Sequence, residues 1–78
     1  MPPRIRHLKS ELRRAGFLEE THRGKGSHSW WIHPSVGDVR VNLSGRDGAD
    51  ARDYQECDVR KALLRVWDAL GRSENRNG

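Results

Sequence analysis

Cysteine and aromatic residues are scarce in this chain, and long apolar runs are missing altogether. Cys57 is the only cysteine among 78 residues, so neither an internal disulfide nor a cysteine-based zinc site can form, which favours a reducing compartment. No apolar run approaches the roughly 18 residues of a membrane-spanning helix, and the start of the chain lacks the apolar core of a signal peptide. We therefore expect a cytoplasmic protein without a membrane segment, a metal or another cofactor.

Length and charge narrow the class of protein further. A chain of 78 residues has room for one domain with one modest core. Hydrophobic residues make up 33% of it, and their clear periodicity indicates a folded chain rather than a disordered one. Lys and Arg number 15 against 11 Asp and Glu, a net charge of +4. A polyanion such as nucleic acid is a plausible partner, although many small proteins are basic for no such reason.

Apolar periodicity predicts two amphipathic helices. The first spans about residues 4–15 and ends at Gly16, because a left-handed residue is expected just past a helix. The second follows Asp53, which together with Glu56 has the form of a capping box, and it ends before Gly71. Its expected core stripe comprises Val59, Ala62, Leu63, Val66, Trp67 and Leu70.

Three short strands are expected between the helices, since apolar and polar residues alternate there. They span residues 17–22, 27–33 and 39–44. The first two meet at a glycine-rich hairpin turn over 24–26, and a link over 34–37 joins the last two. The polar segment 44–53 is long enough to be mobile or to have a binding role.

The order helix, strand, strand, strand, helix predicts an α+β fold. Both helices are expected side by side on one face of a three-stranded antiparallel sheet, because each has one apolar stripe to bury. We expect a single domain over residues 4–70. The tail, residues 71–78, contains no apolar residue and is expected to be disordered.

Two adjacent tryptophans stand in the second predicted strand. Because successive strand residues point to opposite faces, Trp30 shares a face with His28 and Ile32, whereas Trp31 shares the other face with His33. One tryptophan enters the core and the other lies on the open face, but both faces are apolar, so the pattern does not decide which. An exposed tryptophan can stack on a nucleobase or anchor a protein partner, or it can simply be covered by neighbouring side chains.

His28 is the candidate catalytic residue. It follows a turn on which Arg23 and Lys25 gather positive charge. An imidazole with a pKa of about 6.5 can take a proton from a ribose 2′-hydroxyl or give one to a leaving 5′-oxygen, while nearby cations hold the phosphodiester. Such cleavage needs no metal. The alternative is a histidine with only a structural or solvent-facing role.

The stretch GKGSHSWWIHP, preceded by LRRAGF and followed by DVRKALLRV, resembles the HicA family of bacterial toxins. The resemblance covers about residues 4–70 and implies a double-stranded-RNA-binding-domain-like fold. It further implies an mRNA interferase of a type II toxin–antitoxin system, with His28 of the Gly-Ser-His motif as its catalytic residue and a HicB antitoxin as its partner. The segment NLSGRDGADARDYQECDV departs from the shorter link of commoner members.

Further candidate residues follow from position and charge. The expected RNA-contacting residues are Arg23, Lys25, Ser27, Arg40 and Arg46, and the expected partner-contacting residues are Trp30 and Ile32. Arg40 and Arg46 are the weaker candidates, because each is equally well explained as an ordinary solvated charge. Two other functions stay open: a non-catalytic module that binds double-stranded RNA, and a protein-interaction module that has lost nuclease activity.

Overall fold

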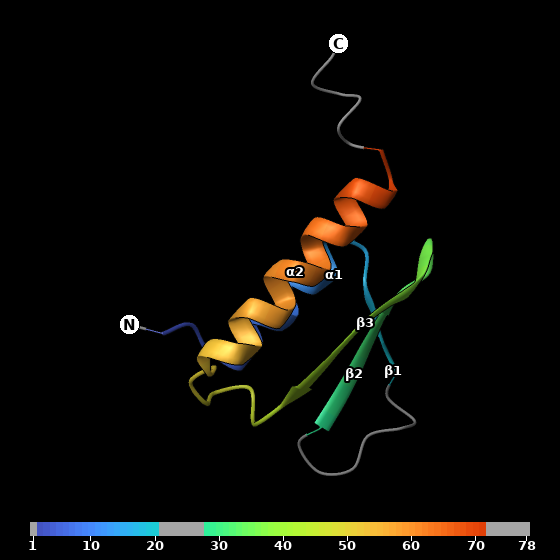
Figure 1. Cartoon of the computed structure of the whole chain (residues 1–78). Coiled ribbons are helices and arrows are strands. Elements are labelled where there is room, and N and C mark those ends of the chain that lie inside the picture. The colour runs from blue at the N-terminus through green and yellow to red at the C-terminus, as the bar shows by residue number, and fades with distance from the viewer. Residues whose placement is uncertain (1, 21–27, 72–78) are drawn as a thin grey trace.

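The computed structural model describes residues 2–20 and 28–71, whose elements follow the predicted order (Figure 1). The helices are α1 (Ile5–Arg14) and α2 (Asp53–Ala69), and the strands are β1 (Leu18–Glu20), β2 (His28–His33) and β3 (Val36–Ser44). The predicted α+β fold is confirmed. The glycine turn over 24–26, the candidate residues Arg23, Lys25 and Ser27, and the tail from residue 72 lie outside the described residues.

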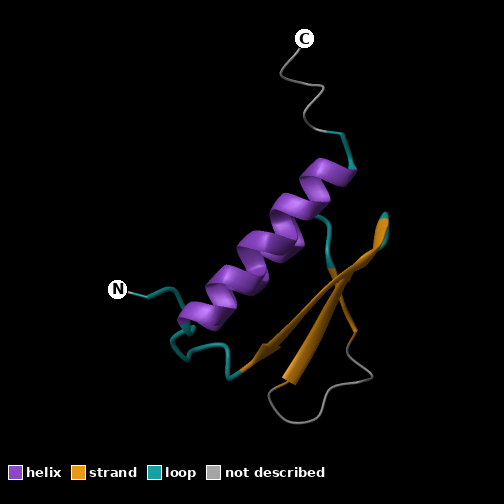
Figure 2. Cartoon of the chain, in the orientation of Figure 1, coloured by secondary structure: helices purple, strands orange, loops and turns teal. Residues whose placement is uncertain are grey.

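The described strands form one antiparallel sheet in the order β1-β2-β3, with both helices on one of its faces (Figure 2). The central strand β2 pairs Trp31 with Glu19 of β1 and with Val41 of β3. Trp31 and Val41 point toward the helices and are buried. The meander and the one-sided helix layer were therefore predicted correctly.

The turn between β2 and β3 is tighter than the predicted link over 34–37. β3 already begins at Val36, which pairs with His33, so only Pro34 and Ser35 form the turn. A shift in register between Ile32 and His33 accommodates it. The Ser35 backbone N–H donates to His33 Nδ1 at 3.1 Å, so the histidine ring itself closes the turn. Alternation of polarity does not reveal a turn that a side chain organises.

The core lies between the sheet and the helices. Its largest fully buried side chains come from both layers: Trp31, Phe17, Ile5, Leu12, Leu43, Val59 and Val66. The predicted stripe of α2 enters this core only in part. Trp67 remains 40% exposed and Leu70 53% exposed, because α2 is 17 residues long whereas the neighbouring α1 is 10. The last turns of α2 therefore have less of the molecule to pack against.

The predicted capping box at Asp53 and Glu56 is wrong. Arg52 is the N-cap of α2, and its backbone N–H donates to Gln55 Oε1 at 2.8 Å. Gln55 Nε2 donates in turn to the Ser44 carbonyl at 2.9 Å, which ties the start of α2 to the end of β3. The Gln55 amide can form both hydrogen bonds because it accepts and donates, whereas the carboxylate of Glu56 could only accept.

The segment after β3 has a structural role that its polar sequence did not indicate. The first backbone N–H groups of an α-helix have no partner within the helix. Here Ile5 N donates to the Ala49 carbonyl at 2.9 Å, and Arg6 N donates to the Asp47 carbonyl at 3.0 Å. The Arg4 side chain also donates to the Gly48 carbonyl at 2.7 Å. The loop thus caps α1, a role that the expectation of a mobile or binding segment did not include.

Candidate functional site

The two tryptophans of β2 separate as the strand alternation requires. Trp31 is completely buried under the helices, and its Nε1–H donates to Ser29 Oγ at 3.1 Å. The Ser29 hydroxyl donates onward to the Leu43 carbonyl at 3.3 Å, so the polar atoms of this buried pair are satisfied. Trp30 lies half-buried on the opposite face. The structure therefore assigns Trp31 to the core and Trp30 to the open side.

The open sheet face, defined as the side of the sheet away from α1 and α2, gathers side chains from all three strands. Its rows follow from the register: Leu18, Ile32 and Arg40 in one row, Glu20, Trp30 and Asn42 in the next, and His28 with Ser44 at the end. Leu18 is 57% exposed. The face thus combines an apolar centre with an imidazole at one end of β2.

His28 lies in a shallow surface depression at the start of β2. The residues that line this depression, called the His28 depression below, are Lys9, Glu19, His28, Ser29, Gly45, Arg46 and Asp47. The His28 side chain is exposed, and within the described ranges its ring forms no hydrogen bond. An exposed imidazole retains both nitrogens for a ligand, whereas a structural histidine uses them for the protein.

Lys9 brings positive charge into the His28 depression from α1. Its Nζ donates to Asp47 Oδ1 at 2.7 Å, and the lysine side chain is only 14% exposed. This hydrogen bond, followed by the charge of Lys9, holds the pKa of Asp47 below its ordinary value of 3.8. The charges of Arg13 and Arg6 lower that pKa further, while slight desolvation acts in the opposite direction. Lys9 of α1 thus lines the same depression as His28.

His33 has the opposite environment. It is 5% exposed, and because its Nδ1 accepts from Ser35 N–H, its Nε2–H donates to the Ala15 carbonyl at 3.0 Å. Its ring meets Phe17 edge-on at 5.2 Å. Gly16, with φ +99°, leaves room for it, since a Cβ at that position would lie 2.9 Å from Nε2. His33 is therefore a structural residue, and it does not share a face with His28.

The predicted site residues are brought together only in part. Arg46 lines the His28 depression, and Trp30 and Ile32 share the open sheet face with His28. Arg40 lies on that face in the row of Ile32, farther along the sheet from His28. Arg23, Lys25 and Ser27 were predicted to contact RNA, and they fall outside the described residues.

Lys9 and Asp47 were missed by the sequence reasoning. Asp47 lies 38 positions after Lys9, so no local pattern could have paired them. The signal that was present is the spacing of Arg6, Lys9 and Arg13, which recur at three and four residues and so share one face of a helix. That basic face would have pointed to α1 as a source of cations for the site.

Comparison with known proteins assigns no role to the residues of this site. No family model, curated protein or solved structure matches this chain. In the described part of the chain, His, Cys, Asp and Glu nowhere gather in the groups of three or more that a metal ion would need. Within residues 2–20 and 28–71, no helix has the length and apolar character of a membrane span.

Proposed function

We propose that the chain is an endoribonuclease in which His28 transfers the proton. The observation that carries the proposal is a solvent-facing imidazole in a depression shared with Lys9 and Arg46. General acid–base catalysis by one positioned histidine contributes typically about 10²–10⁴-fold in rate. Cations beside the imidazole stabilise the charge that develops on a phosphate during the reaction.

The reaction uses the substrate's own nucleophile. The ribose 2′-oxygen attacks the adjacent phosphorus and loses its proton, the bond from phosphorus to the 5′-oxygen breaks, and that oxygen gains a proton. The products are a 2′,3′-cyclic phosphate and a 5′-hydroxyl. Neutral His28 takes the first proton or, when protonated, supplies the second, and water serves the other step. Arg46 holds the non-bridging phosphate oxygens, together with the Lys9 Nζ donors that Asp47 does not accept.

The biological setting follows from the resemblance to HicA toxins. We infer a cytoplasmic toxin of a type II toxin–antitoxin system that cleaves mRNA and is neutralised by a HicB-type antitoxin. Trp30 and Ile32, with the exposed Leu18 beside them, form an apolar centre on the same face as His28. A protein that buries this centre also covers the imidazole, so binding and inhibition are coupled.

A non-catalytic module for double-stranded RNA is the second candidate, and the basic face of α1 favours it. Two features oppose it. Helix N-termini commonly bind phosphate, but the first N–H groups of α1 are taken by carbonyls of Asp47 and Ala49. The first turn of α2 carries Asp53 and Glu56, which repel phosphate. Neither helix N-terminus offers a phosphate site.

The deciding experiment compares the parent with His28→Ala on a short RNA and on the same RNA with one 2′-deoxynucleotide at the cleavage position. We expect the parent to cut the all-RNA strand to a 2′,3′-cyclic phosphate, with a chelator present or absent. Cleavage should fall at least about 10²-fold for His28→Ala and should stop at the 2′-deoxy position. Ser10→Ala, an exposed change on α1, is the matched control. Equal cleavage by His28→Ala would refute the proposal, and tight duplex binding without cleavage by the parent would support the binding module.

A further inference from the structure

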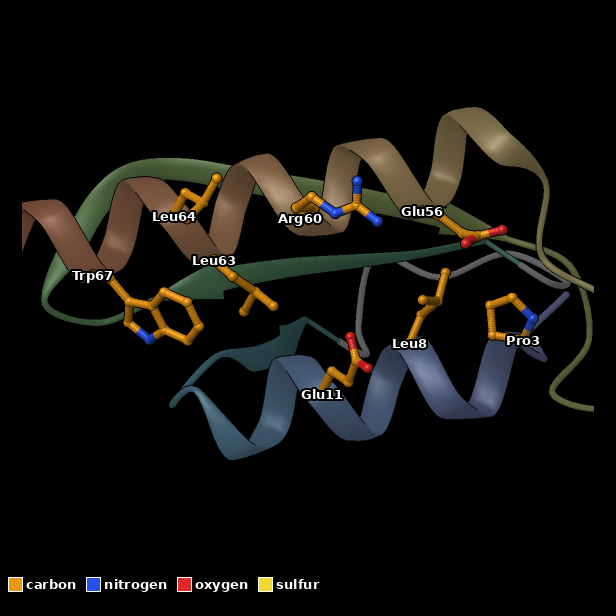
Figure 3. Close-up of a pocket in the computed structure, with 8 residues that line it drawn as sticks. All are labelled: Pro3, Leu8, Glu11, Glu56, Arg60, Leu63, Leu64 and Trp67. Carbon is orange, nitrogen blue, oxygen red and sulfur yellow. The ribbon is translucent and has the colours of Figure 1, made fainter.

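A groove runs between α1 and α2 on the outer side of the helix layer (Figure 3). Its apolar wall comprises Pro3, Leu8, Leu63, Leu64 and Trp67, and charged residues border it: Glu11, Glu56 and Arg60. This groove shares no lining residue with the His28 depression. It is thus a second surface, separate from the first.

Exposed apolar side chains recur along the second half of α2 and at its C-cap, Leu70. Among the described residues, Leu64 is 48% exposed, Trp67 40% and Leu70 53%. Single exposed apolar residues are ordinary, but neighbours on one helix beside a groove mark an interaction surface. Trp and Arg are also the side chains that most often dominate binding energy at interfaces.

The positions of Arg60 and Trp67 make this surface complementary to the same surface of a second copy of the chain. Arg60 and Trp67 are seven residues apart on α2, with Leu63 and Leu64 midway between them. If two α2 helices pack antiparallel about a two-fold axis at Leu63 and Leu64, Arg60 of each copy faces Trp67 of the other. A guanidinium over an indole is attractive by about 0.5–2 kcal/mol. The contact forms twice, because a two-fold interface uses the same patch on both chains.

The edge of the groove repeats this arrangement. Glu11 and Arg14 both lie on the α1 side of the groove, where they flank Leu63 and Trp67. They are three residues apart on one helix, so the two-fold axis that reverses α2 also reverses their order. If the two α1 helices approach each other in the dimer, an acid of one copy then faces a base of the other. A partner of uniform charge fits this surface less well, because it would be repelled by the residues that carry its own sign.

We propose that two copies of the chain associate through the α2 surface formed by Arg60, Leu63, Leu64 and Trp67. The patch occupies one side of a 17-residue helix, so the interface belongs to the small class below about 1,200 Å², which gives weak association that depends on concentration. The proposal is independent of the nuclease function and stands or falls separately.

A pair of complementary variants tests the arrangement by sedimentation equilibrium. We expect the parent chain to pass from its monomer mass of 9.0 kDa to twice that mass as its concentration rises. Arg60→Glu and Trp67→Lys should each remain monomeric, because the first places glutamate against Trp67 and the second places lysine against Arg60. An equimolar mixture should dimerise again, since one Glu–Lys pair and one native Arg–Trp pair then form.

Controls separate this interface from general stickiness or misfolding. Leu18→Glu removes an exposed apolar residue from the open sheet face and should dimerise like the parent. Circular dichroism should show the same helix content for all four proteins. A parent that stays monomeric at millimolar concentration, a mixture that fails to recover, or equal loss in Leu18→Glu would each overturn the proposal.

Discussion

The two faces of β2 use the same residue types for opposite purposes. Trp31 and His33 point into the molecule, and every nitrogen of their rings forms a hydrogen bond there. Trp30 and His28 point to the open sheet face, and the imidazole of His28 lines a depression shared with cations. Position along the strand, and not residue type, therefore decides whether a tryptophan or a histidine stabilises the fold or is available to a ligand.

The tryptophan pair gives the largest contrast that we expect. Trp31→Ala removes a completely buried side chain and leaves a cavity, so the free energy of unfolding should fall by about 3–5 kcal/mol. In a domain this small, such a loss approaches the whole stability of the fold. Trp30→Ala removes a half-buried side chain and should cost about 1 kcal/mol or less. Urea denaturation followed by far-ultraviolet circular dichroism measures both.

Trp31→Phe provides the control for volume within the core. It keeps an apolar ring but loses the Nε1–H that donates to Ser29 Oγ, so its stability should lie between the other two. If Trp30→Ala destabilised the protein as strongly as Trp31→Ala, the assignment of Trp30 to the open side and of Trp31 to the core would be contradicted.

Substitution of His33 should lower the stability of the fold, whereas substitution of His28 should lower activity alone. His33→Ala removes the acceptor for Ser35 N–H, the donor to the Ala15 carbonyl and the contact with Phe17. We expect a loss of about 2–3 kcal/mol in unfolding free energy, since the change empties a buried site and removes two hydrogen bonds. His28→Ala changes an exposed residue and should move stability by about 0.5 kcal/mol or less, although it removes the proposed proton transfer.

His33→Gln is the informative companion, because its amide can both accept and donate, as the ring does here. It should recover part of the stability that His33→Ala loses. Full stability in His33→Ala would show that the turn over Pro34 and Ser35 does not depend on the ring.

The sequence predicted the contrast between these faces but not its direction. Period-two alternation correctly placed His28, Trp30 and Ile32 together. It could not say which side is buried, because Ile32 makes the open side look apolar as well. That choice depends on where α1 and α2 pack, and on the turn that the His33 ring closes. The pairing of Lys9 with Asp47 depends likewise on a loop that folds back 38 residues later.

The weakest effect concerns the ion pair between Lys9 and Asp47, at the edge of the His28 depression. The pKa of Asp47 is below 3.8 in the folded chain because Lys9 favours its ionised form. A carboxyl whose pKa is lowered by folding stabilises the protein above its unfolded pKa, and this contribution is lost as the pH falls through the lowered value. The parent should thus be slightly more stable than Asp47→Asn at pH 7, and the difference should shrink below about pH 4. Asp47 is well exposed, so the effect is small and salt should screen it.

Thermal unfolding of the parent and of Asp47→Asn from pH 7 to pH 2 measures this difference in stability. Asp38→Asn, which removes the exposed pair with Arg65, is the matched control. A gap between parent and Asp47→Asn that stayed constant down to pH 2 would mean that the charge of Asp47 is not its cause.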